Sequence, residues 1–430
     1  MTDLLSVEQA RDRILAAVSP LEAETRPLLE ALDHVLAEDV VSSVTVPPAA
    51  NSGMDGYAVR AADTVGAGPG TPVLLAVLGT AAAGHAFGDP VGPGQAVRIM
   101  TGAPLPPGTD AVVRFEDTGE AAPGQVAIYA AVRPGNYVRP AGQDIRAGEV
   151  VVVRGTLLRP AHIGVLASVG RAEVRVIRRP RVGVLATGDE LVPVGEPLQP
   201  GQIYNSNTYS MAAQVTVAGG IPVLLGIARD TRSDLTACFR RGLEARVDLL
   251  ITSGGVSMGD FDVVKDVLQA EGRMDFWRVN MKPGKPLAFG HLGPVPHLGL
   301  PGNPASSMVA FQQFARPAIL KMRGLTGLDS PTVEVILDED VPALPDERRQ
   351  YVRVVVEARE GEWHARFSGS QDSGVLTSMA RANALVVVPE GATGARAGER
   401  VLAQWIDAPP NLSRWKFVLL GGLPGPGLTG

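Results

Sequence analysis

The apolar residues of this chain follow two patterns. Some recur at the spacing of a helix, and others form short continuous runs that are typical of strands. At the amino terminus, apolar residues recur at helical spacing from Val7 to Val18, after an S-x-x-Q capping box that begins at Ser6. Pro20 follows this pattern and cannot continue a helix. The pattern therefore predicts a first helix over about residues 7–18.

Short apolar runs and helical patterns alternate in the middle of the chain. Runs begin at Arg181, Val223 and Leu249, and helical patterns separate them. Asn207 and Ser233 are the expected caps of the two intervening helices. This alternation of strands and helices predicts a parallel α/β sheet with right-handed crossovers.

Two other regions contain short apolar runs without helical spacing. Between residues 47 and 144 these runs, such as Val73–Leu78 and Val126–Ala130, alternate with Gly and Pro clusters and predict a small all-β domain. The segments on either side of it share a mixed helix and strand character, so we expect the β domain to be an insertion. Residues 332–407 contain β-rich runs such as "YVRVVVEA" and predict a compact, β-barrel-like domain.

The expected fold class is therefore α/β and β, in several domains. A length of 430 residues is too long for one ordinary core. We expect a discontinuous N-terminal domain over residues 1–46 and 145–178, a β domain over 47–144, an α/β domain over 179–328, a C-terminal β-barrel-like domain over 329–408 and a flexible tail over 409–430.

Composition narrows the classes of function. With 50 glycines, 35 prolines and only 5% aromatic residues, the chain is expected to have short elements and tight turns. A formal net charge of -6 argues against a nucleic-acid or anionic-membrane surface. The single cysteine, Cys238, excludes an internal disulfide and fits a small core residue in a reducing cytoplasm. No apolar run approaches the ~20 residues of a membrane span, so we expect a soluble, unprocessed protein.

The stretch 247–304 holds three polar loops that follow apolar segments. Gly254 and Gly255 end a short apolar run, at the strand end where open α/β sheets bind ligands. The turn "KPGKP" presents Lys282 and Lys285 with little backbone freedom, which suits phosphate.

The third loop contains Asn303 and Pro304, which we expect to be the N-cap and first residue of a helix whose free N–H groups favour an anion. Asp260 and Asp262 lie between the first two loops and could hold a divalent metal. Taken singly, these residues could merely cap helices or face solvent. Occurring together at successive strand ends, the three loops favour a site for phosphate and metal.

Motifs of several common chemistries are missing from the sequence. Lys285 is followed by proline and lacks the upstream glycine of a Walker A loop, and no G-x-G-x-x-G opens a helix. The six histidines form no H-x-x-x-H or H-E-x-x-H pair, and "GGVSMG" lacks the glycine spacing of a serine-hydrolase elbow. Covalent catalysis therefore has no candidate nucleophile.

In this order, "SGGVSMGD", "KPGKP" and "LPGNP" resemble loops of the molybdopterin molybdenumtransferase family, which includes the MoeA proteins and the gephyrin E domain. Further loops resemble the family as well: "NSGMDGYAV", "IMTGAPLPPGTDAVV", "RPAGQDI", "ATGDEL", "RRQYVRV" and "GSQDSGVLTSMARANALVVVPE". The resemblance extends from about Ser6 to Ile406. Small departures are Gly53, Gln143 and Phe261, where the family often has Ala, Glu and Tyr.

The resemblance implies a four-domain, elongated homodimer whose N-terminal domain contributes to dimerisation. Its central domain would be a three-layer α/β domain of the MogA and MoaB type that binds molybdopterin. The implied reaction converts adenylylated molybdopterin and molybdate to molybdenum cofactor and AMP with Mg2+. The active site would be shared between the two subunits.

Positions that match the family's loops acquire implied roles. The implied catalytic residues are Asp55, Thr101, Glu190, Asp262, Lys282 and Lys285. The implied substrate-binding residues are Gly254, Gly255, Ser257, Asp144, Asp230, Gly302, Asn303, Ser306, Arg353 and Ser373. The implied metal ligands are Glu190, Asp260 and Asp262. These residue types fit the chemistry, because Mg2+ prefers oxygen ligands and Lys and Arg offset the charge of phosphate and molybdate.

Two other functions stay open at this point. The chain could be a scaffold that keeps the fold and binds protein partners, as gephyrin does, or a paralogue that uses tungstate in place of molybdate. The resemblance also implies contacts with a Mog-type adenylylating protein and with molybdoenzyme acceptors in the cytoplasm. We expect no nucleic-acid or membrane partner.

Overall fold

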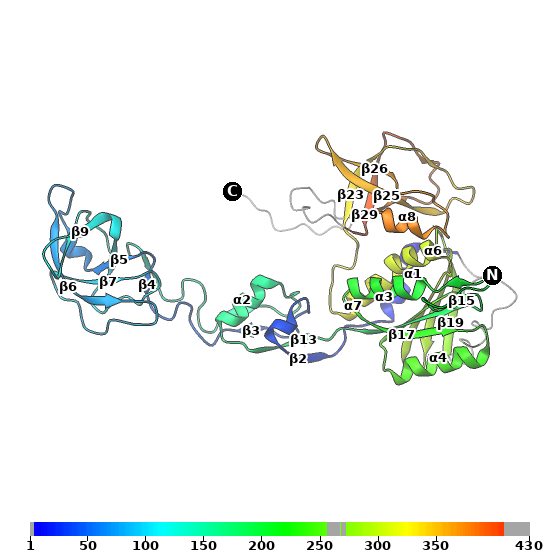
Figure 1. Ribbon diagram of the computed structural model, residues 1–430, viewed down its shortest axis with the longest axis horizontal. Helices are drawn as coiled ribbons and strands as arrows, with labels where there is room; N and C mark the ends of the chain where they lie inside the picture. The colour runs from blue at the N-terminus through cyan, green and yellow to red at the C-terminus, as the bar shows by residue number, and fades with distance from the viewer. Residues whose placement is uncertain (1–3, 256–266, 268–271, 408–430) are drawn as a thin grey trace. The chain divides into compact units, whose positions relative to one another are not determined.

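The computed structural model describes residues 4–255, 267 and 272–407. The chain divides into two compact units, which we call the smaller unit (residues 25–176) and the larger unit (residues 1–24 and 177–430) (Figure 1). Each unit has its own hydrophobic cores. The boundaries of the four predicted domains stay a prediction. Within the described residues, no helix is long and apolar enough to cross a membrane.

A seven-stranded sheet forms the centre of the larger unit. Its strand order is β1-β19-β21-β22-β18-β14-β17. Four neighbouring strands are parallel, and they are β22 (Val295–Leu300), β18 (Leu249–Ser253), β14 (Arg181–Thr187) and β17 (Ile221–Ala228). The remaining strands, β1 (Leu4–Leu5), β19 (Gly272–Val279) and β21 (Pro286–Leu292), extend the sheet with mixed directions. The predicted α/β class is confirmed.

Helices cover both faces of this sheet (Figure 1). On β14, Val184 packs into the core with α3 (Asn207–Val217), whereas its neighbour Leu185 packs into the core with α4 (Arg232–Glu244). Alternate residues of a strand point to opposite faces, so one apolar strand contributes to both layers. Cys238 of α4 is buried in the second core, as its sequence context predicts.

The predicted helix starts are partly right. The box at Ser6 forms, with the Gln9 N–H donating to Ser6 Oγ, and α1 spans Val7–Ala16. The caps predicted for α3 and α4 are wrong by one or two residues. Asn207 is the first residue of α3 rather than its cap, and Thr231, not Ser233, accepts the N–H of Asp234 at the start of α4. Asn207 is instead used for a tertiary contact.

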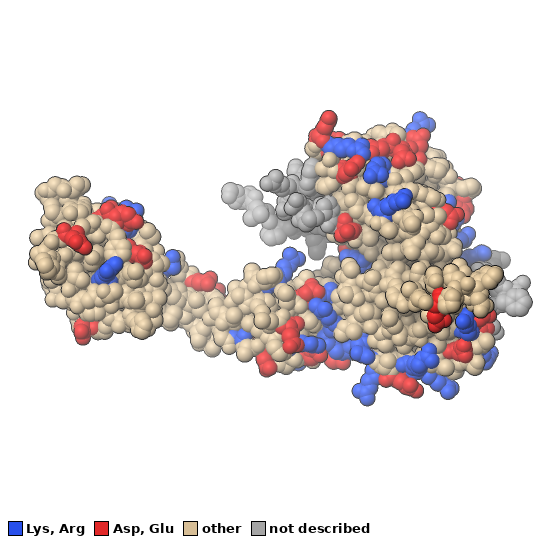
Figure 2. All heavy atoms as spheres, viewed as in Figure 1, with Lys and Arg blue, Asp and Glu red and all other residues tan. Residues whose placement is uncertain are grey.

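After β22 the chain forms α6 (Pro304–Ala310), a π-helical turn (Phe311–Ala315) and α7 (Arg316–Met322). We expected an irregularity near Pro317, because proline has no N–H to donate. The wider π-helical turn ends at Ala315, two residues before this proline. Figure 2 shows basic and acidic side chains interspersed on the visible face of the larger unit.

The C-terminal part of the larger unit is a closed β-barrel. Its order is β25-β26-β23-β29-β27, and β27 pairs back with β25. The strands are β23 (Thr332–Leu337), β25 (Arg349–Arg359), β26 (Glu362–Phe367), β27 (Ala384–Val388) and β29 (Arg400–Trp405). The two-residue strand β20 (Met281–Lys282) adds to β25, so the lysine turn is hydrogen-bonded to the barrel. Tyr351 of β25 is buried in the core of the α/β sheet.

The smaller unit contains a six-stranded sheet in the order β8-β5-β7-β6-β10-β9. Its strands are β5 (Gly56–Val59), β6 (Val73–Ala81), β7 (Gln95–Ile99), β8 (Ala111–Arg114), β9 (Thr118–Glu120) and β10 (Gln125–Ile128). A separate core lies around α2 (Pro160–Ser168), with residues of the short strands β3 (Val40–Val41), β12 (Val150–Val152) and β13 (Glu173–Ile177). Strand β2 (Ala23–Pro27) pairs with β13. The inserted β region is thus present as expected.

Candidate active site

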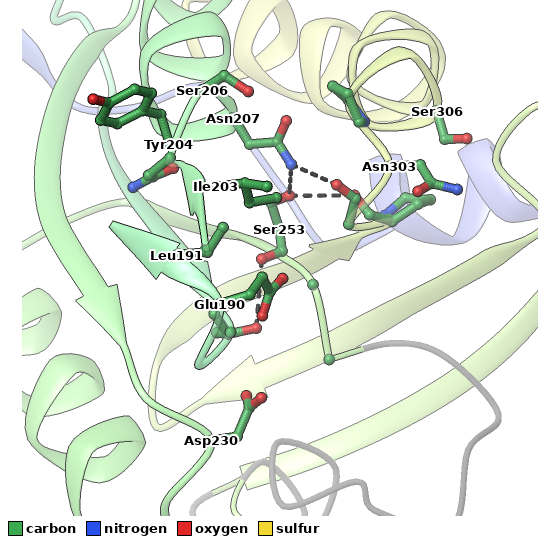
Figure 3. A pocket seen from close by; sticks show the side chains of 18 of the residues that line it. Glu190, Leu191, Ile203, Tyr204, Ser206, Asn207, Asp230, Ser253, Asn303 and Ser306 are labelled. Carbon is green, nitrogen blue, oxygen red and sulfur yellow. Dashed lines mark hydrogen bonds between the residues drawn. The ribbon is translucent and has the colours of Figure 1, made fainter. Parts of the chain in front are cut away.

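A pocket of about 590 Å³ lies beyond the carboxyl ends of three parallel strands of the larger unit (Figure 3). Residues that follow β14, β18 and β22 line it, together with the start of α3. This is the edge at which open α/β sheets bind ligands. Seven of the predicted site residues line this pocket, namely Glu190, Asp230, Gly254, Gly255, Gly302, Asn303 and Ser306. Pro304, the predicted first residue of the next helix, lines it as well.

The glycine turn after β18 is needed for the shape of the pocket. Gly254 has φ +98°, and a Cβ there would lie 2.7 Å from the carbonyl oxygen of Thr187. The Gly254 N–H donates to the carbonyl oxygen of Leu300 at 3.1 Å, which ties this turn to the end of β22. Only glycine combines this backbone conformation with such close approach.

Asn207 joins two loops of the pocket (Figure 3). Its Nδ2 donates to Ser253 Oγ and to the carbonyl oxygen of Gly302, both at 2.7 Å. Ser253 Oγ in turn donates to the carbonyl oxygen of Pro301 at 3.2 Å. The sequence analysis missed this role, because the pattern before a helix indicates only a cap. The sequence signal for this role was the second Asn in "YNSN", a further polar side chain at the start of the helix.

Three carboxylates gather on one side of the pocket. Glu190 and Asp230 line it, and the Asp230 N–H donates to Asp189 Oδ1 at 3.1 Å. Arg229 Nη1 donates to the carbonyl oxygens of Asp189 and Leu191, which holds the loop after β14. Partial desolvation, followed by the negative charges of Asp189 and Glu190, raises the pKa of the Asp230 carboxyl. The charges on this side of the pocket therefore repel one another.

These carboxylates fit a hard divalent cation such as Mg2+. Carboxylate oxygens are its preferred protein ligands, and a cation would relieve the repulsion that, after desolvation, raises the pKa of Asp230. In the described ranges no group of three His, Cys, Asp or Glu side chains is arranged as a complete metal site. Glu190 and Asp230 would thus supply part of a ligand set. The predicted residues Ser257, Asp260 and Asp262 lie outside the described residues.

The loop at Asn303 differs from its prediction. Asn303 stands at the N-cap position of α6 but makes no side-chain cap, and its Nδ2 donates to Ser373 Oγ at 2.9 Å. The N–H of Ala305, in the first turn of α6, donates to the carbonyl oxygen of Ser373 at 3.1 Å. The predicted cap and free helix N–H groups are therefore partly replaced by contacts with a loop of the C-terminal region. Ser306 is buried beside them at the pocket.

Lys282 and Lys285 lie on the turn between β19 and β21, the first exposed and the second partly buried. A second cavity of about 160 Å³ is lined by Lys282 and Arg353 among others. Arg353 is only 1% exposed, and it donates from Nε to Ser378 Oγ and from Nη2 to the carbonyl oxygens of Ser370 and Asp372. Its burial lowers its pKa. Much of its hydrogen bonding thus shapes the loop that carries Ser373.

The smaller unit contains the other predicted catalytic residues. Asp55 Oδ1 accepts the N–H of Thr101 at 2.6 Å and Thr101 Oγ1 at 2.7 Å, although these residues are 46 positions apart. These two hydrogen bonds lower the pKa of Asp55. Asp144 is exposed in a different turn, where its N–H donates to the carbonyl oxygen of Val46. The structure thus brings Asp55 and Thr101 into direct contact. From the sequence, both were expected at the site only because their loops resemble those of the family.

Three family profiles match successive parts of the chain. The MoeA N-terminal region (domain I and II) matches residues 5–170, a probable molybdopterin binding domain matches 183–321, and the MoeA C-terminal region (domain IV) matches 334–405. The order agrees with the β region, the α/β sheet and the closed barrel described above.

Individual relatives match over nearly the full length. A molybdopterin molybdenumtransferase of Haemophilus influenzae is 36% identical over 404 residues, which are 93% of this chain and 98% of the relative. Molybdopterin molybdenumtransferase 2 of Mycobacterium tuberculosis is 39% identical over 383 residues, 88% of this chain and 93% of the relative. The crystal structure of a molybdopterin biosynthesis MoeA protein from Pyrococcus horikoshii is similar with a TM-score of 0.81 and 32% identity, covering 94% of this chain and 100% of that chain. This chain belongs to the molybdopterin molybdenumtransferase family.

Proposed function

We propose that this protein inserts molybdenum in the biosynthesis of the molybdenum cofactor, converting adenylylated molybdopterin and molybdate to the cofactor and AMP. The observation that supports this most is the pocket at the strand ends, where glycine turns, carboxylates and a polar clamp from α3 meet. A scaffold that kept only the fold would not need these groups. The membership in the family agrees with the same reaction.

Each group of pocket residues has a distinct task in this proposal. The turn at Gly254 and Gly255 lets a phosphate approach the backbone closely, and Lys282 and Lys285 offset its negative charge. Glu190 and Asp230 hold Mg2+, with Asp260 and Asp262 as further ligands. Bound there, Mg2+ supplies charge neutralisation and Lewis-acid polarisation of the phosphoric anhydride.

The loop 368–375, together with Ser306 and Arg353, supplies the molybdate site. Molybdate is a tetrahedral dianion, and Arg353, Ser373 and Ser306 can donate hydrogen bonds to it while Lys285 balances its charge. Ser373 Oγ accepts a hydrogen bond from Asn303, which lines the main pocket. Arg353 and Lys282 line the second, smaller cavity. Tungstate has nearly the same size and charge, so it is the natural competitor.

The test is an assay with purified protein, adenylylated molybdopterin, Mg2+ and either molybdate or tungstate. We expect oxyanion-dependent release of AMP and formation of metal-loaded pterin, both lost without Mg2+. Absence of AMP release with both oxyanions would reject the reaction. A response to tungstate alone would assign the chain to the tungstate paralogue.

We further propose a cytoplasmic homodimer whose active site combines Asp55 and Thr101 of one subunit with the pocket of the other. Asp55→Ala and Lys282→Ala should each give an inactive dimer. If the site is shared, co-refolded mixtures contain heterodimers with one intact site, and about a quarter of normal activity returns in a two-fold dimer. Mixtures as inactive as their parents, with heterodimers confirmed by native mass spectrometry, would show that each site is built within one chain. A Mog-type adenylylating protein and molybdoenzymes would be the partners before and after this reaction.

A further inference from the structure

The backbone just before the lysine turn is held by two other parts of the larger unit. The Asn280 N–H donates to the carbonyl oxygen of Leu5 at 2.8 Å, and the carbonyl oxygen of Asn280 accepts the N–H of Arg349 at 3.2 Å. Arg348 Nη1 donates to the carbonyl oxygen of Met281 at 3.0 Å. Residues 280–282 therefore lie between the amino-terminal strand and the barrel.

The pairing of this segment with the barrel is short. β20 has two residues, and its register places Met281 opposite Arg349 and Lys282 opposite Gln350. A pairing of this length is not expected to be stable without support from side chains. The position of Lys282 thus depends on what holds β25 in place.

Arg349 supplies such a support at the first residue of β25. Its Nη1 contacts Glu8 Oε1 of α1 at 2.5 Å, and its Nη2 contacts Glu390 Oε2 at 2.9 Å. One guanidinium therefore connects α1, the strand β25 and the segment after β27. Although partial burial opposes it, the hydrogen bond from Arg349 lowers the pKa of Glu8, so the contact is charged at neutral pH.

Two other arginines of the barrel make similar pairs without this connection. Arg359 contacts Glu357 and Asp338, and Arg400 contacts Glu334 and Glu362, so all their partners lie within the barrel. Their side chains are 42% and 52% exposed, compared with 18% for Arg349. Exposed ion pairs contribute little, whereas a more buried charge that loses its partner is costly.

We propose that Arg349 is a positioning residue for substrate binding, because its contacts with Glu8 and Glu390 hold β25 against residues 280–282 and so set the position of Lys282. The inference rests on the proposed function, in which Lys282 acts on the substrate. Arg349 itself lines neither described cavity of the site. Its effect on catalysis is therefore indirect.

The test compares Arg349→Met with the matched control Arg359→Met in the full-length protein. Hydrogen exchange measured by mass spectrometry reports on the amides of residues 280–282, and steady-state AMP release reports on KM and kcat. For Arg349→Met we expect exchange and the KM for adenylylated molybdopterin each to rise about tenfold, whereas Arg359→Met changes either by less than about twofold. Arg349→Lys should recover part of the KM, since it keeps a charge but not both contacts.

Glu8→Gln is a milder variant that keeps the barrel's own contacts. As a single change, Glu8→Gln should raise the hydrogen-exchange rate of the amides of residues 280–282. In a protein that already carries Arg349→Met, it should cause no further increase in that rate. Unchanged exchange in both variants would overturn the proposal, and so would faster exchange with a wild-type KM. If the wild-type protein releases no AMP, the proposed reaction is wrong, while exchange still decides whether Arg349 holds the segment.

Discussion

Two carboxylates of this protein, Asp55 in the smaller unit and Asp230 in the larger unit, have opposite environments. Asp55 accepts two hydrogen bonds from Thr101, and these lower its pKa. Asp230 is partly desolvated beside Asp189 and Glu190, and its pKa is raised. The first carboxylate is satisfied within its own domain, whereas the second belongs to a group of like charges.

The difference indicates what each region needs from outside. A carboxylate that is already hydrogen-bonded keeps its charge and geometry without a ligand, so Asp55 is preorganised to contact a substrate. Carboxylates that repel one another are stabilised by a cation. The pocket of the larger unit is therefore expected to depend on a metal, and the Asp55 site is not.

The largest expected effect is on turnover, in Glu190→Gln. Loss of one negative oxygen ligand should reduce Mg2+-dependent AMP release by at least about a hundredfold at saturating Mg2+. Glu196→Gln, an exposed residue of the same loop, is the matched control and should keep normal activity. A Glu190→Gln protein that stays active at low Mg2+ would show that Glu190 is not a Mg2+ ligand and that the pocket of the larger unit does not depend on it.

A large effect on stability is expected for Gly254→Ala. The new Cβ would meet the Thr187 backbone at 2.7 Å in a left-handed conformation, so we expect a loss of roughly 2–4 kcal/mol in the free energy of unfolding. Gly102→Ala, next to Thr101, has φ +83° but nothing within 4 Å of its Cβ, and should lose only about 1 kcal/mol. Equal losses in denaturant titrations would show that close backbone approach does not distinguish the two sites.

A moderate effect is expected for Thr101→Val, which removes the hydroxyl donor but keeps the backbone N–H. The pKa of Asp55 should move up toward its ordinary value, and the acid limb of the pH dependence of kcat/KM should move to higher pH. A lowered carboxyl pKa stabilises the folded state above the unfolded pKa, and this contribution is lost as pH falls. Thr101→Val should thus be less stable than the wild type near pH 7 and equal to it at strongly acid pH, with Thr101→Ser close to the wild type.

The smallest effect on stability is expected for Asp230→Asn. A raised carboxyl pKa favours folding below the unfolded pKa, and this advantage is lost as pH rises through the folded pKa. Asp230→Asn should therefore be more stable than the wild type near pH 8, by roughly 0.5 kcal/mol because the carboxylate is exposed, and no different near pH 3. Added Mg2+ should narrow the gap in melting temperature. A less stable Asp230→Asn protein at pH 8 would mean that desolvation and repulsion do not destabilise the charged carboxylate there.

The sequence by itself determined the features that depend on local pattern. Apolar spacing identified the first helix, the strands of the α/β sheet and the β regions, because burial of one face imposes a period on nearby residues. Glycine turns at strand ends identified Gly254 and Gly255, since few other residues fit such turns. The helix starts at Asn207 and Ser233 were wrong by one or two residues, because polar residues before a helix are locally equivalent.

Only the tertiary structure decided which distant groups meet. The hydrogen bond between Asp55 and Thr101, the contact of Asn303 with Ser373 and the ion pair of Arg349 with Glu8 each join residues far apart in the sequence. Strand order and barrel closure bring these residues together, and neither can be predicted from the periodic spacing of apolar residues that are close in sequence. A side chain that seems to cap a helix in the sequence can therefore be used for a contact that becomes possible only when the sheets have formed.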